Sequence, residues 1–317
     1  MDIEGLLTYL ETFMAKEDIR IKEPMSRHTS FRVGGPAGVF IRVPREKELK
    51  KIIFYLYTHK LPYFILGNGS NLLVADEGYD GVILSLGDAF TQIEVSDTQM
   101  RIGAACLLGK AAKEAMEASL SGLEFAAGIP GSVGGGVVMN AGAYGGELSQ
   151  VVTEVRAMNE QGEVVFLKKE ELEMGYRSSI FKRKPYIVLE VTVELKPEKK
   201  EEIFARMQEY NRLRQEKQPL EYPSAGSSFK RPKGFFAGKL IMDAGLRGFS
   251  VGGAQISEKH CGFVINKNKA TATDIRLLME EVQRQVKQQF GVELEPEVIF
   301  LDRAAKAADE EEKIEEK

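Results

Sequence analysis

Residues 123–136 read LEFAAGIPGSVGGG, and residues 140–145 continue this glycine-rich segment as NAGAYG. Glycine has no Cβ atom and reaches positive φ, so main-chain N–H groups can close around a flat, negatively charged ligand. A second turn of this kind, LGNGSNLL at residues 66–73, lies upstream between apolar runs. Two turns lined by main chain in one protein predict a large dinucleotide rather than a single phosphate.

The turn at residues 67–71 matches neither of the common phosphate-binding motifs. It lacks the Gly-Lys-Ser/Thr of a P-loop, and it lacks the third glycine of the G-x-G-x-x-G fingerprint. A plain hairpin turn is therefore the alternative for this turn, whereas its asparagine and serine side chains are candidate donors to phosphate oxygens. The length of the second segment favours a ligand, because its small side chains do not form a core by themselves.

The composition is that of a soluble globular protein with two or three domains. The chain has 317 residues, of which 43% are hydrophobic and 28% charged, and its net charge is −4. A mixed, slightly acidic composition argues against nucleic acid as a partner. Two cysteines and three histidines show no metal-ligand spacing, so no metal site is predicted. No apolar run reaches the ~20 residues that span a bilayer, and the start is not that of a secretory signal, so we expect a cytoplasmic protein without membrane insertion.

The pattern of apolar residues divides the chain into four segments. Residues 1–89 combine predicted helices at 2–16 and 44–60 with strands at 39–43, 63–66 and 82–86. Residues 90–197 contain short alternating runs that are typical of an antiparallel-rich α+β domain. A Lys/Glu-rich stretch with Pro197 marks a boundary, after which residues 198–303 form a further α+β domain. Residues 304–317 are a charged tail.

Three polar stretches contain candidate catalytic groups. Arg177 is either a surface cation or a fixed guanidinium that binds a carboxylate with two hydrogen bonds. Ser227 is either part of a polar loop or a proton-donating hydroxyl beside positive charge, and the absence of a Gly-x-Ser-x-Gly elbow argues against a hydrolase nucleophile. Glu295 and Glu297 lie in a strand-like run whose alternation predicts both carboxylates on one face. Exposed edge glutamates are the alternative for that pair.

These motifs, in this order, resemble the UDP-N-acetylenolpyruvoylglucosamine reductase family, flavoenzymes that complete UDP-N-acetylmuramate synthesis for bacterial peptidoglycan. The resemblance covers the chain nearly to Leu301 and implies an α+β fold, with a two-part FAD-binding domain of the vanillyl-alcohol-oxidase (PCMH) type followed by an α+β substrate-binding domain. The matching blocks are residues 29–37, 66–73, 128–145, 176–181, 225–230, 237–241 and 294–298.

The resemblance also implies the cofactors and the residues that bind them. FAD would be held non-covalently, NADPH would be the co-substrate, and reduced flavin would deliver hydride to the enolpyruvyl group of a UDP-sugar. The implied cofactor-binding residues are Gly67, Asn68, Gly69, Ser70, Asn71, Leu72, Gly128, Ile129, Pro130, Gly131, Ser132, Gly134, Gly135, Asn140, Ala141 and Gly142.

The catalytic residues that it implies are Arg177 and Glu297, which would polarise the substrate carboxylate, and Ser227, which would donate a proton to the neighbouring carbon. Lys217, Arg247 and His260 match the family's contacts with the UDP-sugar. One class of the family carries a tyrosine-bearing insertion over the substrate. The short path from residue 181 to residue 186 leaves little room for it, so the chain resembles the shorter class.

Two other functions remain open at this stage. A flavin oxidase or dehydrogenase that acts on an alcohol or sugar would turn over with oxygen and usually attaches its flavin covalently, but no residue here matches an attachment motif. A non-enzymatic nucleotide-binding module would use the same glycines without a flavin and would be colourless when purified. We expect a monomer or weak oligomer with small-molecule partners.

Overall fold

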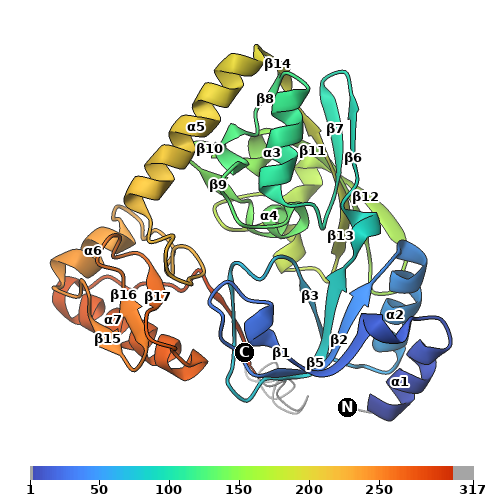
Figure 1. Cartoon of the computed structure of the whole chain (residues 1–317), viewed down its shortest axis with the longest axis horizontal. Coiled ribbons are helices and arrows are strands. Elements are labelled where there is room, and N and C mark those ends of the chain that lie inside the picture. Colours follow the sequence, from blue (N-terminus) through green and yellow to red (C-terminus); the bar gives the residue numbers. More distant parts are fainter. Residues whose placement is uncertain (1–2, 303–317) are drawn as a thin grey trace, which may run out of the picture.

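The structure, a computed structural model, describes residues 3–302. We divide it at the predicted boundaries into an N-terminal part (3–89), a middle part (90–197) and a C-terminal part (198–302), which lie at the lower right, the top and the lower left of Figure 1. The predicted charged tail at 304–317 lies outside the described residues.

The N-terminal part is built around a four-stranded sheet in the order β1-β2-β5-β3, in which β2 and β3 run parallel to β5. Leu49, Ile52, Ile53 and Leu56 form one fully buried face of the helix between β2 and β3, as their helical spacing predicts. The elements are α1 (Ile3–Glu11), β1 (Ile19–Pro24), β2 (Pro36–Val43), α2 (Glu46–Thr58), β3 (Tyr63–Leu66), β4 (Leu72–Val74) and β5 (Tyr79–Leu86).

The first glycine turn follows directly from β3, and the parallel pairing of this strand with β5 fixes the position of the turn. Gly69 has a φ of +62°, and a Cβ there would lie 1.9 Å from the main-chain oxygen of His28. Only glycine satisfies both conditions, because other residues rarely adopt this φ and none has room for its side chain.

The middle part has a five-stranded antiparallel sheet in the order β12-β11-β13-β7-β6, which confirms the predicted antiparallel arrangement. Its core is apolar, and α3 packs on it with Ala111, Ala112 and Ala115 buried. The elements are β6 (Ile93–Ser96), β7 (Gln99–Gly103), α3 (Leu108–Glu117), β8 (Leu120–Ser121), α4 (Val133–Met139), β9 (Gly142–Ala143), β10 (Gly146–Glu147), β11 (Val152–Met158), β12 (Val164–Lys168), β13 (Ile187–Glu194) and β14 (Lys196–Pro197).

Part of the second glycine-rich segment is a short, mostly buried helix, α4, rather than a bare loop. Ser132 caps α4 by accepting from the N–H of Gly135. A Cβ on Gly134 would lie 2.9 Å from the Cβ of Ala104, and one on Gly136 would lie 3.0 Å from Leu148. Gly134 and Gly136 therefore have a packing role, which corrects the interpretation that this whole segment lacks a core of its own.

The C-terminal part has a three-stranded antiparallel sheet, β15-β16-β17, covered by α7 with its buried apolar face. The last strand, β18, leaves this part and pairs in parallel with β4 of the N-terminal part, with Ile299 opposite Leu72. The C-terminal end of the described chain is thus joined to the strand that follows the first glycine turn. The elements are α5 (Lys200–Lys217), α6 (Ala237–Asp243), β15 (Ser250–Val251), β16 (Ala254–Ile256), β17 (Val264–Asn266), α7 (Ala272–Phe290) and β18 (Ile299–Leu301).

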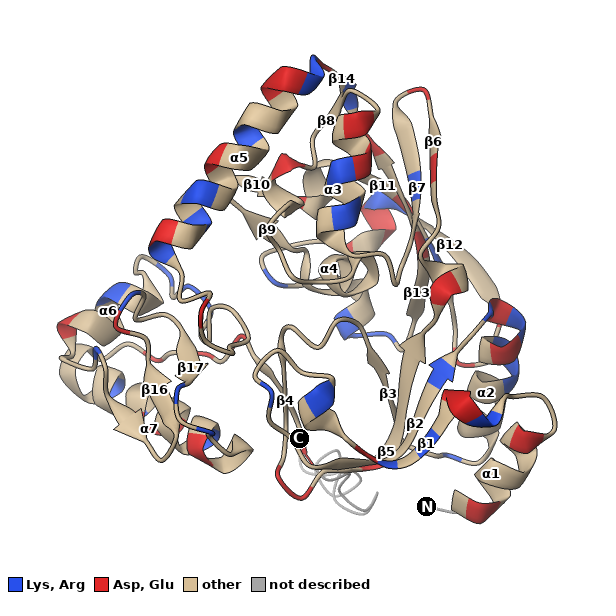
Figure 2. Cartoon of the chain, viewed as in Figure 1, with Lys and Arg blue, Asp and Glu red and all other residues tan. Residues whose placement is uncertain are grey.

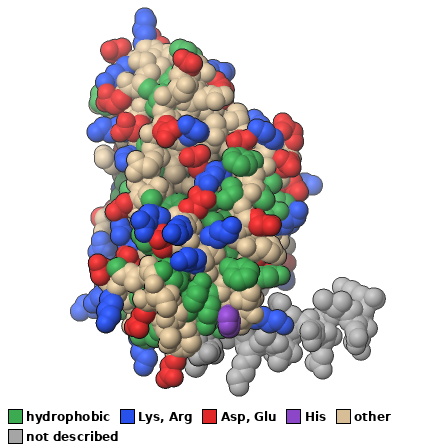
Figure 3. All heavy atoms as spheres, turned by 90° about the vertical axis from the view of Figure 1, so that its right-hand side faces the viewer, with side chains coloured by type: hydrophobic (Ala, Val, Ile, Leu, Met, Phe, Trp, Pro, Cys, Tyr) green, Lys and Arg blue, Asp and Glu red, His purple; other side chains and the backbone are tan. Residues whose placement is uncertain are grey.

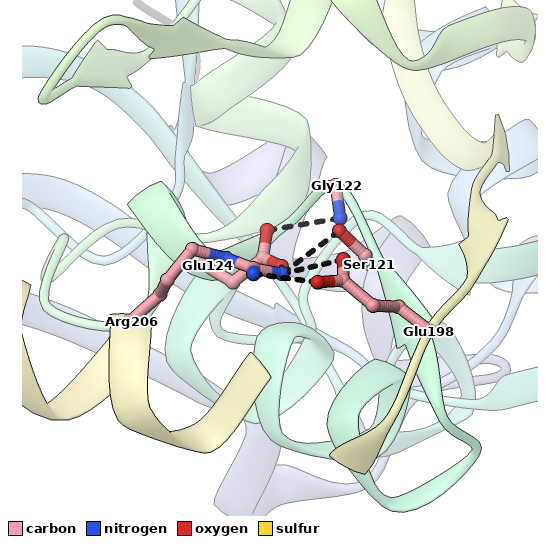
Figure 4. Close-up of polar contacts among 5 residues, drawn as sticks. All are labelled: Ser121, Gly122, Glu124, Glu198 and Arg206. Carbon is pink, nitrogen blue, oxygen red and sulfur yellow. Dashed lines mark hydrogen bonds and ion pairs between the residues drawn. The ribbon is translucent and has the colours of Figure 1, made fainter. Parts of the chain in front are cut away.

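Helix α5, the first element of the C-terminal part, packs against the middle part, and acidic and basic residues alternate along it (Figure 2). Arg206 anchors it by donating to Glu124 and Glu198 at 2.7 Å and to Ser121 at 3.2 Å (Figure 4). Burial by itself would raise the pKa of the Glu124 carboxyl, but the hydrogen bonds from Arg206 and from main-chain N–H groups outweigh it and lower that pKa.

Charged and apolar side chains are mixed on the surface that Figure 3 shows, with basic and acidic groups interspersed. Among residues 3–302, no helix combines the length and the apolar character that crossing a bilayer requires. Within the same range, no group of three or more His, Cys, Asp or Glu side chains is arranged to hold a metal ion.

Replacing Arg206 with alanine is expected to lower the free energy of unfolding by about 1–3 kcal/mol, because the mostly buried Glu124 carboxylate loses its charged partner. Arg212→Ala is the matched control, since Arg212 on the same helix pairs only with exposed Glu209 and Glu216. Urea unfolding of both variants at pH 7 measures the difference, and equal losses would contradict the anchoring role.

The same pair gives a pH dependence with a definite sign. The folded-state pKa of Glu124 is below its ordinary value of 4.5, so the stabilisation is fully present above pH 4.5 and is lost as the pH falls through the folded-state pKa. The difference in stability between the wild type and Arg206→Ala should therefore shrink below pH 4.5.

Candidate active site

The three candidate catalytic residues lie on the wall of one cavity. Arg177, Ser227 and Glu297 come from the middle part and from two segments of the C-terminal part, and they line a space of about 530 Å³. Arg247 and His260 line it too, whereas Lys217 ends α5 and is not among the lining residues. The cavity wall also includes residues for which no role was predicted from the sequence: Tyr176, Phe229, Arg231, Phe236, Ala237, Gly238, Lys239, Met242, Lys259, Cys261 and Gly262.

An ion pair between Arg177 and Glu297 forms the centre of the site. The Nε of Arg177 donates to Oε1 of Glu297, and the two side chains are only 21% and 12% exposed. Arg177 has a φ of +52°, which is unusual for a side-chain-bearing residue and costs about 1–2 kcal/mol. Two hydrogen bonds between Gly175 and Ser178 close the turn that holds this conformation. Main-chain strain at a functional group is typical of an active site.

Cations surround the Glu297 carboxylate. Burial raises the pKa of Glu297, while the charges of Arg177, Lys182 and Lys230 act in the opposite direction. Burial also lowers the pKa of the Lys182 ammonium, and the nearby charge of Lys230 lowers it further. Because Lys230 also pairs with Glu295, three cations face two carboxylates here, and the one positive charge in excess suits an anionic ligand. Lys230 ends the block at 225–230 and Lys182 follows the block at 176–181, but nothing in the sequence indicated that they approach Glu297.

Two neighbouring serines have different environments. Ser228 is fully buried, and its hydroxyl accepts from the main-chain N–H of Val264 at 2.9 Å. Its own N–H donates to the main-chain oxygen of Gly262 at 2.8 Å. These bonds fix the loop so that Ser227 lies on the cavity wall. The geometry is compatible with a proton-donating role for Ser227 and gives Ser228 a structural one.

His260 presents a neutral ring to the cavity. Its Nδ1 accepts from the N–H of Gly262 at 3.0 Å, so the ring proton is on Nε2. Burial lowers the pKa of His260, which favours the same neutral form. A neutral imidazole in this position is a hydrogen-bond donor rather than a cation.

The carboxylates of Glu295 and Glu297 do not share one environment, contrary to the alternation predicted from the sequence. Only Ile299–Leu301 forms a strand in this run. The Glu295 side chain is 69% exposed and pairs with Lys230, whereas Glu297 is buried against Arg177. Residues before the strand do not alternate because no sheet ladder constrains them.

The two glycine-rich segments lie side by side, as the prediction of one shared ligand requires. Asn68 Nδ2 donates to the main-chain oxygen of Pro130 at 2.7 Å. A Cβ on Gly67 would lie 2.6 Å from the Ser132 hydroxyl. A Cβ on Gly131 would meet nothing closer than 3.5 Å. The described protein therefore has space for a side chain at Gly131, as expected where a ligand approaches the main chain.

The asparagine side chains of the first turn have partners within the protein. The sequence assigns both to phosphate oxygens, but Asn68 donates to Pro130 and Asn71 Nδ2 donates to the main-chain oxygen of Glu297 at 3.0 Å. Each amide nitrogen carries a second N–H, so these contacts leave the predicted donation to phosphate oxygens a prediction.

Family models match two regions of the chain. A model described as "FAD binding domain" matches residues 37–168. A model described as "UDP-N-acetylenolpyruvoylglucosamine reductase, C-terminal domain" matches residues 218–301. Together they support the predicted fold class, in which an FAD-binding domain precedes a separate C-terminal α+β domain.

Relatives match almost the whole chain. A UDP-N-acetylenolpyruvoylglucosamine reductase from Agathobacter rectalis is 51% identical over 291 residues, which cover 88% of this chain and 92% of that protein. The protein of this name from Clostridioides difficile is 45% identical over 301 residues and covers 95% and 99%. The crystal structure of the reductase from Thermus caldophilus superposes with a TM-score of 0.77 at 39% identity and covers 89% and 99%.

The resemblance in the sequence motifs is thus confirmed over most of both chains. The regions matched by the family models include the two glycine-rich segments and the segment that carries Glu297, whereas Arg177 lies between these regions. The chain belongs to the UDP-N-acetylenolpyruvoylglucosamine reductase family.

Proposed function

We propose that this chain reduces the enolpyruvyl group of UDP-N-acetylenolpyruvoylglucosamine, using FAD and NADPH, and that Arg177, Glu297 and Ser227 supply the protein's part of the chemistry. The Arg177–Glu297 pair in one cavity with Ser227 carries the proposal. When bound, FAD would be reduced by NADPH, and the reduced flavin would supply the hydride. The domain boundaries, the cytoplasmic location and the monomeric or weakly associated state stay predictions.

The proposed work of Arg177 and Glu297 is to stabilise negative charge. An enol ether is electron-rich and resists hydride unless its carboxylate is polarised. A guanidinium carries five N–H donors, so Arg177 can hold Glu297 and a substrate carboxylate together. A second carboxylate beside Glu297 raises its pKa further, so Glu297 takes up a proton and donates a hydrogen bond to the substrate. Both groups then stabilise the charge that develops in the transition state.

The proposed work of Ser227 is to deliver a proton to the substrate carbon next to the site of hydride addition. The surplus of cations around Glu297 lowers the cost of a developing alkoxide on the serine. Arg247, His260 and the main-chain turns would orient the nucleotide and the cofactor. Lys217 is the one implied substrate contact that is not among the cavity-lining residues, so its role would require approach of the α5 end to the ligand.

The decisive measurement follows flavin absorbance in a stopped-flow instrument. NADPH is mixed first and the UDP-enolpyruvyl sugar second. We expect bleaching of the flavin by NADPH and its recovery on addition of the sugar. A purified protein that is colourless and takes up no FAD would exclude the proposal.

Ser227→Ala is expected to slow the recovery of flavin absorbance by roughly 10²–10³, while bleaching by NADPH continues, because only the second step needs the proton. Ser228→Ala is the matched control, since it removes the buried hydroxyl that binds Val264 and should lower thermal stability. Equal slowing of both half-reactions in Ser227→Ala would rule out a proton donor.

Arg177→Ala should slow recovery of the flavin by at least about 10²-fold, because the substrate carboxylate loses its fixed cation. Arg183→Ala is a nearby comparison, since Arg183 pairs with the exposed Glu173 and is not among the cavity-lining residues. A wild-type rate in Arg177→Ala would remove this residue from the site.

Gly131→Val is expected to reduce the FAD retained per chain while the protein stays folded, because the space around Gly131 accepts a Cβ. Gly69→Val should instead disrupt the turn itself, since its Cβ would overlap the oxygen of His28. Flavin content after gel filtration and the thermal unfolding curve of each variant test this distinction. Full flavin retention in Gly131→Val would mean that the segment is only a loop.

A further inference from the structure

The side chain of Asn71 joins the first glycine turn to the segment that carries Glu297. Asn71 Nδ2 donates to the main-chain oxygen of Glu297 at 3.0 Å across 226 positions of sequence. The main-chain oxygen of Asn71 accepts from the N–H of Ile299, also at 3.0 Å. Asn71 therefore holds the chain on both sides of Val298, at the entrance to β18.

Glu297 depends on this bond because no strand contains it. The strand begins only at Ile299, and the preceding run has a single isolated bridge, between Pro296 and Phe229. The N–H of Glu297 donates to the main-chain oxygen of Ser228 at 2.9 Å. Its two main-chain polar groups are thus fixed from opposite sides, one by the N-terminal part and one by the loop of Ser227. A displaced main chain at Glu297 would carry its carboxylate away from Arg177.

The other asparagine of the turn makes the same kind of bond to a different partner. Asn68 donates to Pro130 in the second glycine-rich segment. One amide of the turn therefore joins the two segments that fit the cofactor, and the other joins the cofactor side to the ion pair. Asn68 can therefore serve as a matched control for Asn71, because the two amides donate to different partners.

We propose that Asn71 is a positioning residue that acts through Glu297, and that its side-chain amide sets the Glu297 carboxylate against Arg177 at the substrate. The inference rests on the function proposed above. In this proposal the main chain of the first glycine turn binds the cofactor, whereas the side chain of Asn71 positions Glu297 for the reaction. The link also fixes the distance between the cofactor side and the group that polarises the substrate, which governs orientation in hydride transfer.

Asn71→Ala tests the proposal in a double-mutant cycle with Glu297→Gln. We expect about tenfold slower recovery of flavin absorbance in Asn71→Ala, the loss that corresponds to one hydrogen bond of this kind. In the Glu297→Gln background the same substitution should slow recovery by less than about twofold, because the group through which Asn71 acts is already altered. Equal factors in both backgrounds would overturn the proposal.

A second measurement does not depend on activity. Amide hydrogen exchange in the segment 296–299, where Glu297, Val298 and Ile299 carry N–H groups, should be faster in Asn71→Ala. Asn68→Ala should instead lower flavin retention. Asn71→Asp keeps the shape of the side chain but removes its N–H donor, and it is expected to slow the recovery of flavin absorbance at least as much as Asn71→Ala does. The test therefore still decides if the alanine variant folds poorly. Unchanged exchange at 296–299 would contradict the positioning role.

Failure of this inference is distinguishable from failure of the proposed function. If the wild type recovers its flavin colour on addition of the sugar and Asn71→Ala does so at the same rate, only the role of Asn71 is wrong. If Asn71→Ala loses its flavin while exchange at 296–299 is unchanged, Asn71 acts through the cofactor and the proposal is overturned. A wild type that does not recover overturns both.

Discussion

The ion pair between Arg177 and Glu297 is the interaction around which the active site is organised. It joins residues 120 positions apart, and both side chains are mostly buried. Taking two charges out of water costs free energy that their attraction does not always restore, so such a pair is weak evidence for stability. Its proposed value is chemical, because the fixed guanidinium and the Glu297 carboxyl, whose pKa is raised by burial, would both act on a substrate carboxylate.

The residues around this pair come from different parts of the fold. Arg177 lies in a strained turn of the middle part, Ser227 in a loop fixed by the buried Ser228, and Glu297 just before a strand that returns to the N-terminal part. No single part holds the complete site. The parallel pairing of β18 with β4 brings the end of the C-terminal part beside the strand that follows the first glycine turn.

Glycine has three different roles in this chain, and the sequence does not separate them. At Gly69 the turn requires positive φ and has no room for a Cβ. At Gly134 and Gly136 the missing side chain permits close packing of α4 against Ala104 and Leu148. At Gly131 neither reason applies within the described residues, and the role proposed for it is contact with the cofactor.

The sequence by itself determined elements such as β3, predicted and found at residues 63–66, and α2, predicted at 44–60 and found at Glu46–Thr58, because an apolar run and a helical spacing are local properties. It also determined the family, through motifs whose order is specific. Only the tertiary structure decided that Glu295 and Glu297 lie in different environments. It alone also places the charge of Lys182 near the Glu297 carboxylate and the side-chain amide of Asn71 against the main-chain oxygen of Glu297. These contacts join residues far apart in the chain, and their geometry follows from the packing of three parts rather than from any local pattern.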